Sequence, residues 1–195
     1  MARIVAGCWK WDGADDARKD SRCQVMIVRA TAFKEHPSYT TNEGIDDSIV
    51  LLSYPFEMTE YVRTICLPPA GEYYQGMGTV AGYGWHSGSI AAKPHSTMMF
   101  VHINLLPSTD CSVPYSHGSE KYILDPVEEI CAGFKSNSRG TCYADSGAPL
   151  MVKIGYHSFV IGILRGGAEV CNTPGFPAIF VRVTSILQWI DGIIH

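Results

Sequence analysis

The chain has 195 residues, of which 46% are hydrophobic and 17% charged, a balance that describes a folded globular protein and excludes an intrinsically disordered one. Its formal net charge is −4 and like charges form no long run, so nothing favours binding to nucleic acid or to a membrane surface. No apolar run approaches the length of a membrane span, and residues 1–5 lack the apolar core of a signal peptide.

Short runs of apolar residues predict a chain built mainly of strands. Two strands are expected at 2–8 and 24–33, around a solvated charged loop at 12–20. After these come six further short strands separated by turn residues, which together predict an antiparallel six-stranded barrel. The six are expected at 78–85, 98–105, 130–134, 148–154, 158–164 and 177–183.

Two helical segments are expected beside the strands. Residues 108–111 predict a short helix or loop. Near the C-terminus, Ile186 and Ile190 recur at helical spacing and predict a terminal helix with Thr184 or Ser185 as its N-cap.

The serine at position 146 stands in a turn rich in glycine and proline. A serine in a sharp turn projects its hydroxyl and leaves neighbouring backbone N–H groups free, which are the parts of a nucleophile with an oxyanion hole. A hydroxyl is nearly inert at neutral pH without a general base, so an ordinary surface turn anchored by a disulfide is the alternative interpretation of this turn alone.

The longer pattern around this serine decides between the two interpretations. Cys-Ala-Gly at 131–133, followed by Cys-x-x-Asp-Ser-Gly-x-Pro-Leu at 142–150, resembles the nucleophile loop of trypsin-like (chymotrypsin-fold) serine proteases. Further segments resemble the same family in the same order, from about residue 24 to residue 195. They lie at 46–52 (triad-aspartate strand), 61–68 (inter-barrel linker), 80–85 (opening strand of the second barrel), 175–183 and 187–190 (closing strand and terminal helix).

The resemblance implies an all-β fold, a chymotrypsin-like double Greek-key β-barrel with a C-terminal helix. The chain contains no segment like the family's Cys-Gly-Gly-Ser-Leu strand or its Ala-Ala-His-Cys histidine loop, so we expect the first barrel to be incomplete. Residues 1–73 would form the remnant of that barrel and the linker. Residues 74–195 would form the second barrel and the helix, and together they would make one peptidase-like domain.

The resemblance also assigns the catalytic residues. Ser146 matches the nucleophile, and Asp46, with Asp47 as the alternative, matches the aspartate that orients the histidine. The histidine itself is absent, because all seven histidines fall at positions that the family uses for other purposes. The oxyanion hole would be formed at Ala144 and Ser146, with Ala144 in place of the family's glycine, where a Cβ would turn the N–H away or strain the loop.

The substrate cleft departs from the family as well. Gly140 matches the base of the primary specificity pocket, with Gly167 and Ala178 on its walls. No aspartate stands there to hold an arginine or lysine, so an apolar or small side chain is expected to fit. Arg165 replaces a small serine beside the triad aspartate, and Gly166 replaces the tryptophan that walls the cleft.

Residues 3–7, Arg-Ile-Val-Ala-Gly, allow two interpretations. They resemble an activation site, where cleavage would free an amine at Ile4 to pair with Asp145, and they also fit the strand that follows the histidine loop. We favour the strand, because the sequence that follows fits it better. Asp145 would then lack an ammonium partner, and we expect a loosened, zymogen-like loop.

Most of the seven cysteines are assigned by the resemblance. It implies disulfides between Cys111 and Cys131 and between Cys142 and Cys171. Two more, at positions 8 and 23, match no cysteine of the family and could close a disulfide private to this chain.

Cys66 in the linker is left over. A disulfide to an outside partner is favoured over a free thiol, because the matching cysteine of two-chain relatives binds a propeptide or regulatory region. No Cys-x-x-Cys or Cys/His cluster occurs at ligand spacing, so we expect no metal and no cofactor.

By resemblance, the chain is a trypsin-like serine endopeptidase family domain that acts on or binds protein or peptide outside the cell. Lacking the triad histidine, it is predicted to be inactive or very weakly active. One hypothesis is a fragment of an active parent whose missing piece supplies the histidine. The alternative is a non-catalytic homologue that serves as a protein-binding scaffold or regulator. A third is a fragment that folds poorly, with open sheet edges.

Overall fold

The computed structural model describes residues 1–10, 20–39, 45–85, 96–112, 115, 122–134, 140–168, 171 and 173–195. The chain divides into two compact units. The first comprises Met1–Thr64 with His95–Met98, and the second comprises Ile65–Pro94 with Met99–His195. The predicted charged loop at 12–20 lies almost wholly outside the described residues.

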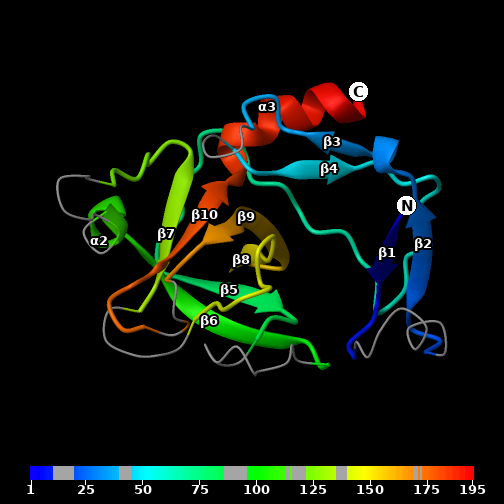
Figure 1. Ribbon diagram of the computed structural model, residues 1–195, viewed down its shortest axis with the longest axis horizontal. Coiled ribbons are helices and arrows are strands. Elements are labelled where there is room, and N and C mark those ends of the chain that lie inside the picture. Colours follow the sequence, from blue (N-terminus) through cyan, green and yellow to red (C-terminus); the bar gives the residue numbers. More distant parts are fainter. Residues whose placement is uncertain are drawn as a thin grey trace. The chain divides into compact units, whose positions relative to one another are not determined.

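A closed antiparallel barrel forms the second unit, with its strands in the order β10-β7-β6-β5-β8-β9 (Figure 1). The six strands lie within one to two residues of most of the boundaries expected from alternation and turn residues, which confirms the all-β barrel. They are β5 (Met77–Gly82), β6 (Met99–Leu106), β7 (Glu129–Gly133), β8 (Pro149–Ile154), β9 (His157–Gly166) and β10 (Ala178–Arg182).

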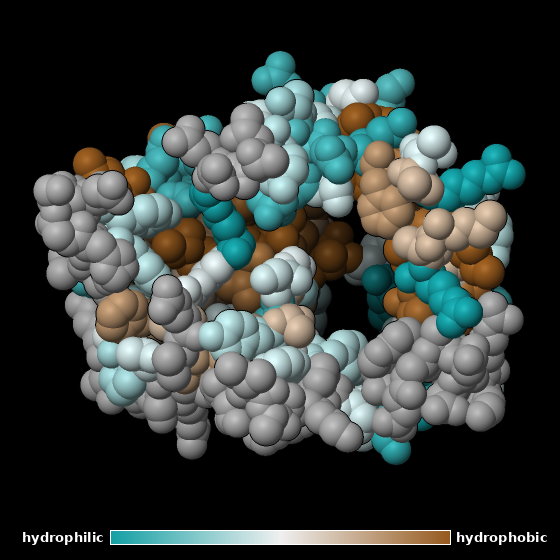
Figure 2. All heavy atoms as spheres, in the orientation of Figure 1, coloured by the Kyte–Doolittle hydropathy of each residue, from teal (hydrophilic) through white to brown (hydrophobic). Residues whose placement is uncertain are grey.

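The barrel core consists of inward-facing aliphatic residues from every strand. Phe180 and Leu150 are fully buried, and Ile103, Ile161 and Val80 pack in the same cluster. Figure 2 shows apolar side chains gathered in the middle of the second unit, where Figure 1 draws β8, β9 and β10. Burying each such side chain contributes roughly 1.5–3 kcal/mol, so the barrel stabilises the loops that project from it.

Two helices accompany the barrel, α2 (Ser108–Ser112) and α3 (Val183–Ile194), and α3 packs against β9 and β10. The terminal helix is confirmed, but its predicted N-cap is wrong. The helix begins at Val183, Arg182 is the N-cap residue without a side-chain cap, and the Ser185 hydroxyl donates to the Arg182 carbonyl at 2.7 Å. The Ser185 hydroxyl therefore bonds the carbonyl of the N-cap residue and does not cap a free N–H group of the helix.

The first unit contains two small antiparallel sheets. One pairs β1 (Ala2–Ala6) with β2 (Gln24–Val28), and the other pairs β3 (Phe33–Glu35) with β4 (Ser48–Val50). A single strand over 24–33 was wrong, because the 3-10 helix η1 (Ala30–Ala32) separates β2 from β3.

Within the described residues, the strands of the first unit close no barrel, in agreement with an incomplete first barrel. A disulfide between Cys8 and Cys23 closes the loop that joins β1 to β2.

Candidate active site

The Ser146 turn is held against the barrel by backbone hydrogen bonds. Gly147 N–H donates to the Leu164 carbonyl at 2.8 Å, and Leu164 N–H donates to the Ala148 carbonyl at 2.9 Å. The turn therefore lies against the second half of β9. Ser146 itself is exposed to solvent. Cys142, four residues before it, is bonded to Cys171, which anchors the other end of the turn.

The Asp145 carboxylate is seated on backbone amides. Its Oδ1 accepts a hydrogen bond from Gly84 N–H at 2.9 Å, and its Oδ2 accepts one from Cys142 N–H at 3.0 Å. A Cβ atom at Gly82 or Gly84 would collide with this carboxylate, so both glycines are needed for its approach to the barrel. Backbone amides thus bind Asp145 where we had considered an ammonium group, and the zymogen-like loosening of its loop stays a prediction.

The interpretation of residues 3–7 as a strand is confirmed. Ile4 lies in the middle of β1, opposite Met26 of β2. Its backbone is therefore part of a sheet ladder in this structure.

Ala144 adopts a left-handed backbone conformation, with φ of +64°. This region is open to glycine and costs an L-amino acid about 1–2 kcal/mol. Of the two effects expected from alanine at this position, the structure supports strain in the loop. The direction in which the Ala144 amide points stays part of the oxyanion-hole prediction.

A small cavity of about 30 Å³ lies in the second unit beside the turn. Gly140, Gly167 and Ala178, the three residues assigned to a specificity pocket, all line it. Phe134 and Phe176 contribute apolar surface to it as well. A single water molecule needs roughly 10–15 Å³ of such space, so the cavity has room for only a small group.

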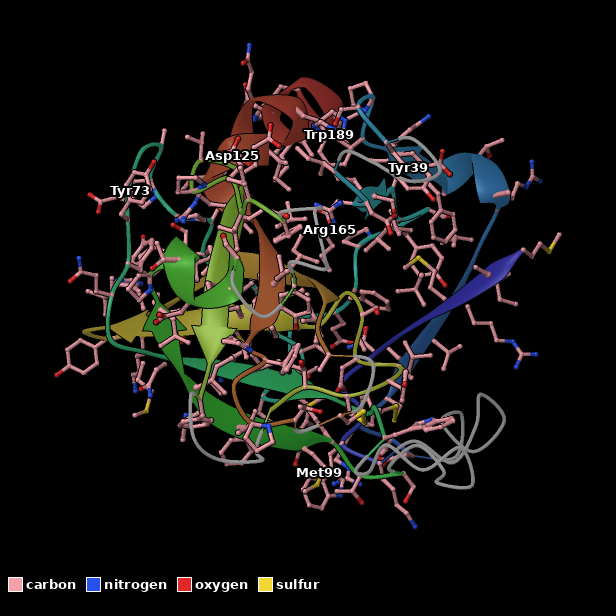
Figure 3. All side chains as sticks on the ribbon, turned by 60° about the vertical axis from the view of Figure 1, so that its left-hand side comes forward. Tyr39, Tyr73, Met99, Asp125, Arg165 and Trp189 are labelled. Carbon is pink, nitrogen blue, oxygen red and sulfur yellow. A yellow bond between two sulfur atoms is a disulfide. The ribbon has the colours of Figure 1, made fainter. Side chains whose placement is uncertain are left out.

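Arg165 forms an ion pair with Glu129. Its Nη1 donates to Oε1 of Glu129 at 2.8 Å, and the Glu129 side chain is only 8% exposed. The Tyr122 hydroxyl donates to the same carboxylate at 3.0 Å, and the backbone N–H of Asp125 donates at 3.1 Å. Figure 3 labels Arg165 and Asp125. Sequence reasoning missed Glu129, although a glutamate at the head of the apolar run 130–132 signals a buried partner.

The two candidate aspartates lie in the first unit, just before β4. Asp46 is exposed and Asp47 is half-buried. Both line a cavity of about 230 Å³ together with Glu35 and Tyr39. The choice of Asp46 over Asp47 stays a prediction.

The described histidines interact with groups other than Ser146. In the second unit, Nδ1 of His102 lies 2.9 Å from the Thr79 hydroxyl, and His195 pairs with Asp191 at 3.6 Å. In the first unit, Nδ1 of His36 lies 2.7 Å from a serine hydroxyl two residues on. Within its own unit, the hydroxyl of Ser146 hydrogen-bonds to no described histidine. His157, also in the second unit, has its ring 6.5 Å from the ring of Phe159. The other three histidines, at 86, 95 and 117, lie outside the described residues.

Disulfides also brace the barrel, where Cys111 is bonded to Cys131. Cys66 is a half-buried free thiol. Among the described residues, no group of three or more His, Cys, Asp or Glu side chains could hold a metal ion. No helix in the described parts of the chain has the length and hydropathy needed to cross a bilayer.

Comparison with known proteins is consistent with this geometry. A family model described as Trypsin matches residues 10–190. The chain is 29% identical over 180 residues to the venom serine protease Bi-VSP of Bombus ignitus, which covers 88% of this chain and 48% of that protein. It is 29% identical to a tryptase of Mus musculus (84% of this chain, 61% of that protein) and 31% identical to a venom protease of Bombus pensylvanicus (78% and 61%). The chain therefore spans about half to three fifths of the length of these relatives.

Proposed function

The chain belongs to the trypsin family of serine proteases, and on that basis we propose that it is a peptidase-like domain that binds protein or peptide beside Ser146 and is inactive or very weakly active as given. Ser146 takes the role of the nucleophile, and Asp46 that of the aspartate of the triad. The observation that carries the proposal is that Ser146 is exposed on a well-anchored turn beside a small cavity, in a sequence with no histidine at the position of the base.

The missing imidazole is the main reason for low activity. A serine hydroxyl needs a general base to take its proton, and loss of a triad member in serine proteases leaves only about 10³–10⁴ over water. We expect the left-handed backbone at Ala144 to displace its N–H from the oxyanion hole as well, and loss of one such donor costs roughly 10²–10³ in turnover.

The cavity supports a preference for a small apolar side chain. Gly140, Gly167 and Ala178 all line it, and no acidic residue is among the described residues that line it. An arginine or lysine side chain would find neither room nor a counter-charge there.

Reaction with a fluorophosphonate probe tests the proposed inactivity. The full chain and its Ser146→Ala variant, which lacks the reactive hydroxyl, would be incubated with the probe and analysed by mass spectrometry. We expect no labelling of either protein. Labelling of Ser146 in the unmodified chain would overturn the proposal. Labelling only after addition of a segment that carries an Ala-Ala-His-Cys-like sequence would support the fragment hypothesis.

A non-catalytic scaffold is the second candidate function. Ala144, Arg165 and Gly166 depart from the family's pattern, and none of them lies in the segment that the missing piece of a fragment would supply. The anchored pair of Arg165 and Glu129 favours this candidate, because it places a charge where the family has a small serine.

Three disulfides support an oxidising compartment, because such bonds persist mainly outside the reducing cytosol. Two of the relatives are named as venom proteases, which also supports an extracellular location. We expect the half-buried thiol of Cys66 to form a disulfide with a partner chain there.

A further inference from the structure

A buried carboxylate, that of Glu129, holds the Arg165 side chain in place. Glu129, 8% exposed, accepts hydrogen bonds from Nη1 of Arg165, from the Tyr122 hydroxyl and from a backbone amide. Burial and the Glu129 charge raise the pKa of the Tyr122 phenol, so it stays a hydrogen-bond donor at neutral pH. The Arg165 guanidinium therefore has a fixed position before any ligand arrives.

The rest of the guanidinium is open to solvent. The Arg165 side chain is 36% exposed, and its contact with Glu129 uses one of five N–H donors. Among the described residues, Nε and Nη2 donate to no other side chain. The guanidinium therefore keeps N–H donors that a ligand could use.

The position of Arg165 is next to both parts of the candidate site. Leu164, the preceding residue, accepts the hydrogen bond from Gly147, which follows Ser146. Gly167, two residues after Arg165, lines the small cavity. A polypeptide that fills the cavity and reaches Ser146 must therefore pass the end of β9.

We propose that Arg165 recognises an acidic side chain, aspartate or glutamate, of a polypeptide bound beside Ser146. This inference rests on the proposed function, because it requires that a peptide binds there. A guanidinium presents parallel N–H donors that match a carboxylate, and such charge-assisted hydrogen bonds are roughly twice as strong as neutral ones. The competing role for Arg165 is purely structural, the neutralisation of buried Glu129.

The test compares two sets of fluorescein-labelled, C-terminally amidated alanine pentapeptides. One set carries glutamate at each position in turn, and the other carries glutamine at the same positions. Affinity for the full chain is measured by fluorescence anisotropy in 20 mM salt, where screening is weak. We expect at least one glutamate peptide to bind about tenfold tighter than its glutamine counterpart.

Two variants separate recognition from structure. In the double variant Arg165→Met with Glu129→Met, which removes both charges of the pair, we expect equal affinity for the two peptides and a cooperative thermal transition. In Arg165→Lys, which keeps the charge but not the planar fork, the preference should fall to about threefold or less. Lys153→Met removes a positive charge elsewhere on the barrel and should keep the full preference.

Each outcome decides a different question. Equal binding of the glutamate and glutamine peptides to the unmodified chain overturns the role of Arg165 and leaves the proposed function standing. A preference for the glutamate peptide that persists in the double variant also overturns the role of Arg165. Binding of neither peptide set overturns the proposed function itself.

Discussion

Replacement of Ala144 by glycine should stabilise the protein. Ala144 has φ of +64°, and it is the one residue other than glycine with positive φ among those that the structure describes. The left-handed conformation costs alanine about 1–2 kcal/mol. Glycine avoids this cost but loses about 0.4–1 kcal/mol because its unfolded chain is more flexible. The difference predicts that Ala144→Gly raises the free energy of unfolding by about 0.5–1 kcal/mol.

Urea denaturation and calorimetry measure this change. For a chain of this length, the gain corresponds to a rise in Tm of about 1–4 °C. Ala70→Gly is the matched control, since Ala70 is also an exposed turn alanine of the second unit but has an ordinary negative φ. The control should lower stability by about 0.4–1 kcal/mol. If both variants lost stability equally, the strain assigned to Ala144 would be refuted.

The same variant also tests the account of low activity. Relief of strain in the loop does not supply a base, so Ala144→Gly alone should show no peptide hydrolysis. Measurable turnover of a small-residue peptide substrate by this variant would show that the loop, and not the missing histidine, limits activity.

Three more variants probe the groups that hold the site. Tyr122→Phe removes a donor to a buried carboxylate and should lower the free energy of unfolding by about 1–2 kcal/mol in urea denaturation. Tyr156→Phe, at a fully exposed residue, should cause no measurable loss. Equal effects of the two variants would contradict the buried network. Burial raises the pKa of Tyr115 to about 12, so its neutral form stabilises the fold below pH 10 and this contribution is lost as pH rises toward 12. Stability should therefore fall less steeply over that range in Tyr115→Phe, and an identical slope would disprove the shift. Gly84→Ala places a methyl group on the Asp145 carboxylate, so it should lower Tm by several degrees, and an unchanged Tm would show that this close approach is dispensable.

The sequence predicted the barrel well because its signal is local. Alternating apolar residues and turn residues mark each strand, and the helical spacing of Ile186 and Ile190 marks the terminal helix. The strand expected at 24–33 was too long, because the apolar run continues into η1 (Ala30–Ala32) without a turn residue. A run of apolar residues does not show where the backbone leaves the extended conformation within it.

The site was harder to predict, since its key contacts join distant segments. Asp145 is seated on the backbone amides of Gly84 and Cys142, and amide groups carry no sequence signal. The pair formed by Glu129 and Arg165 spans 36 residues. The sequence marked Arg165 as unusual, but only the barrel register could show which carboxylate it meets.

The segment around Cys66 has a mechanical consequence. Cys66 N–H donates to the Ser158 carbonyl, and the Cys66 carbonyl accepts from Val160 N–H, both at 3.0 Å, so Cys66 pairs with β9 through one parallel bridge. A partner chain bound through the sulfur of Cys66 would thus be attached to a segment that is hydrogen-bonded to the barrel, and not to a flexible linker. Pulling on that partner chain would load these two hydrogen bonds, and through them the strand that carries Arg165.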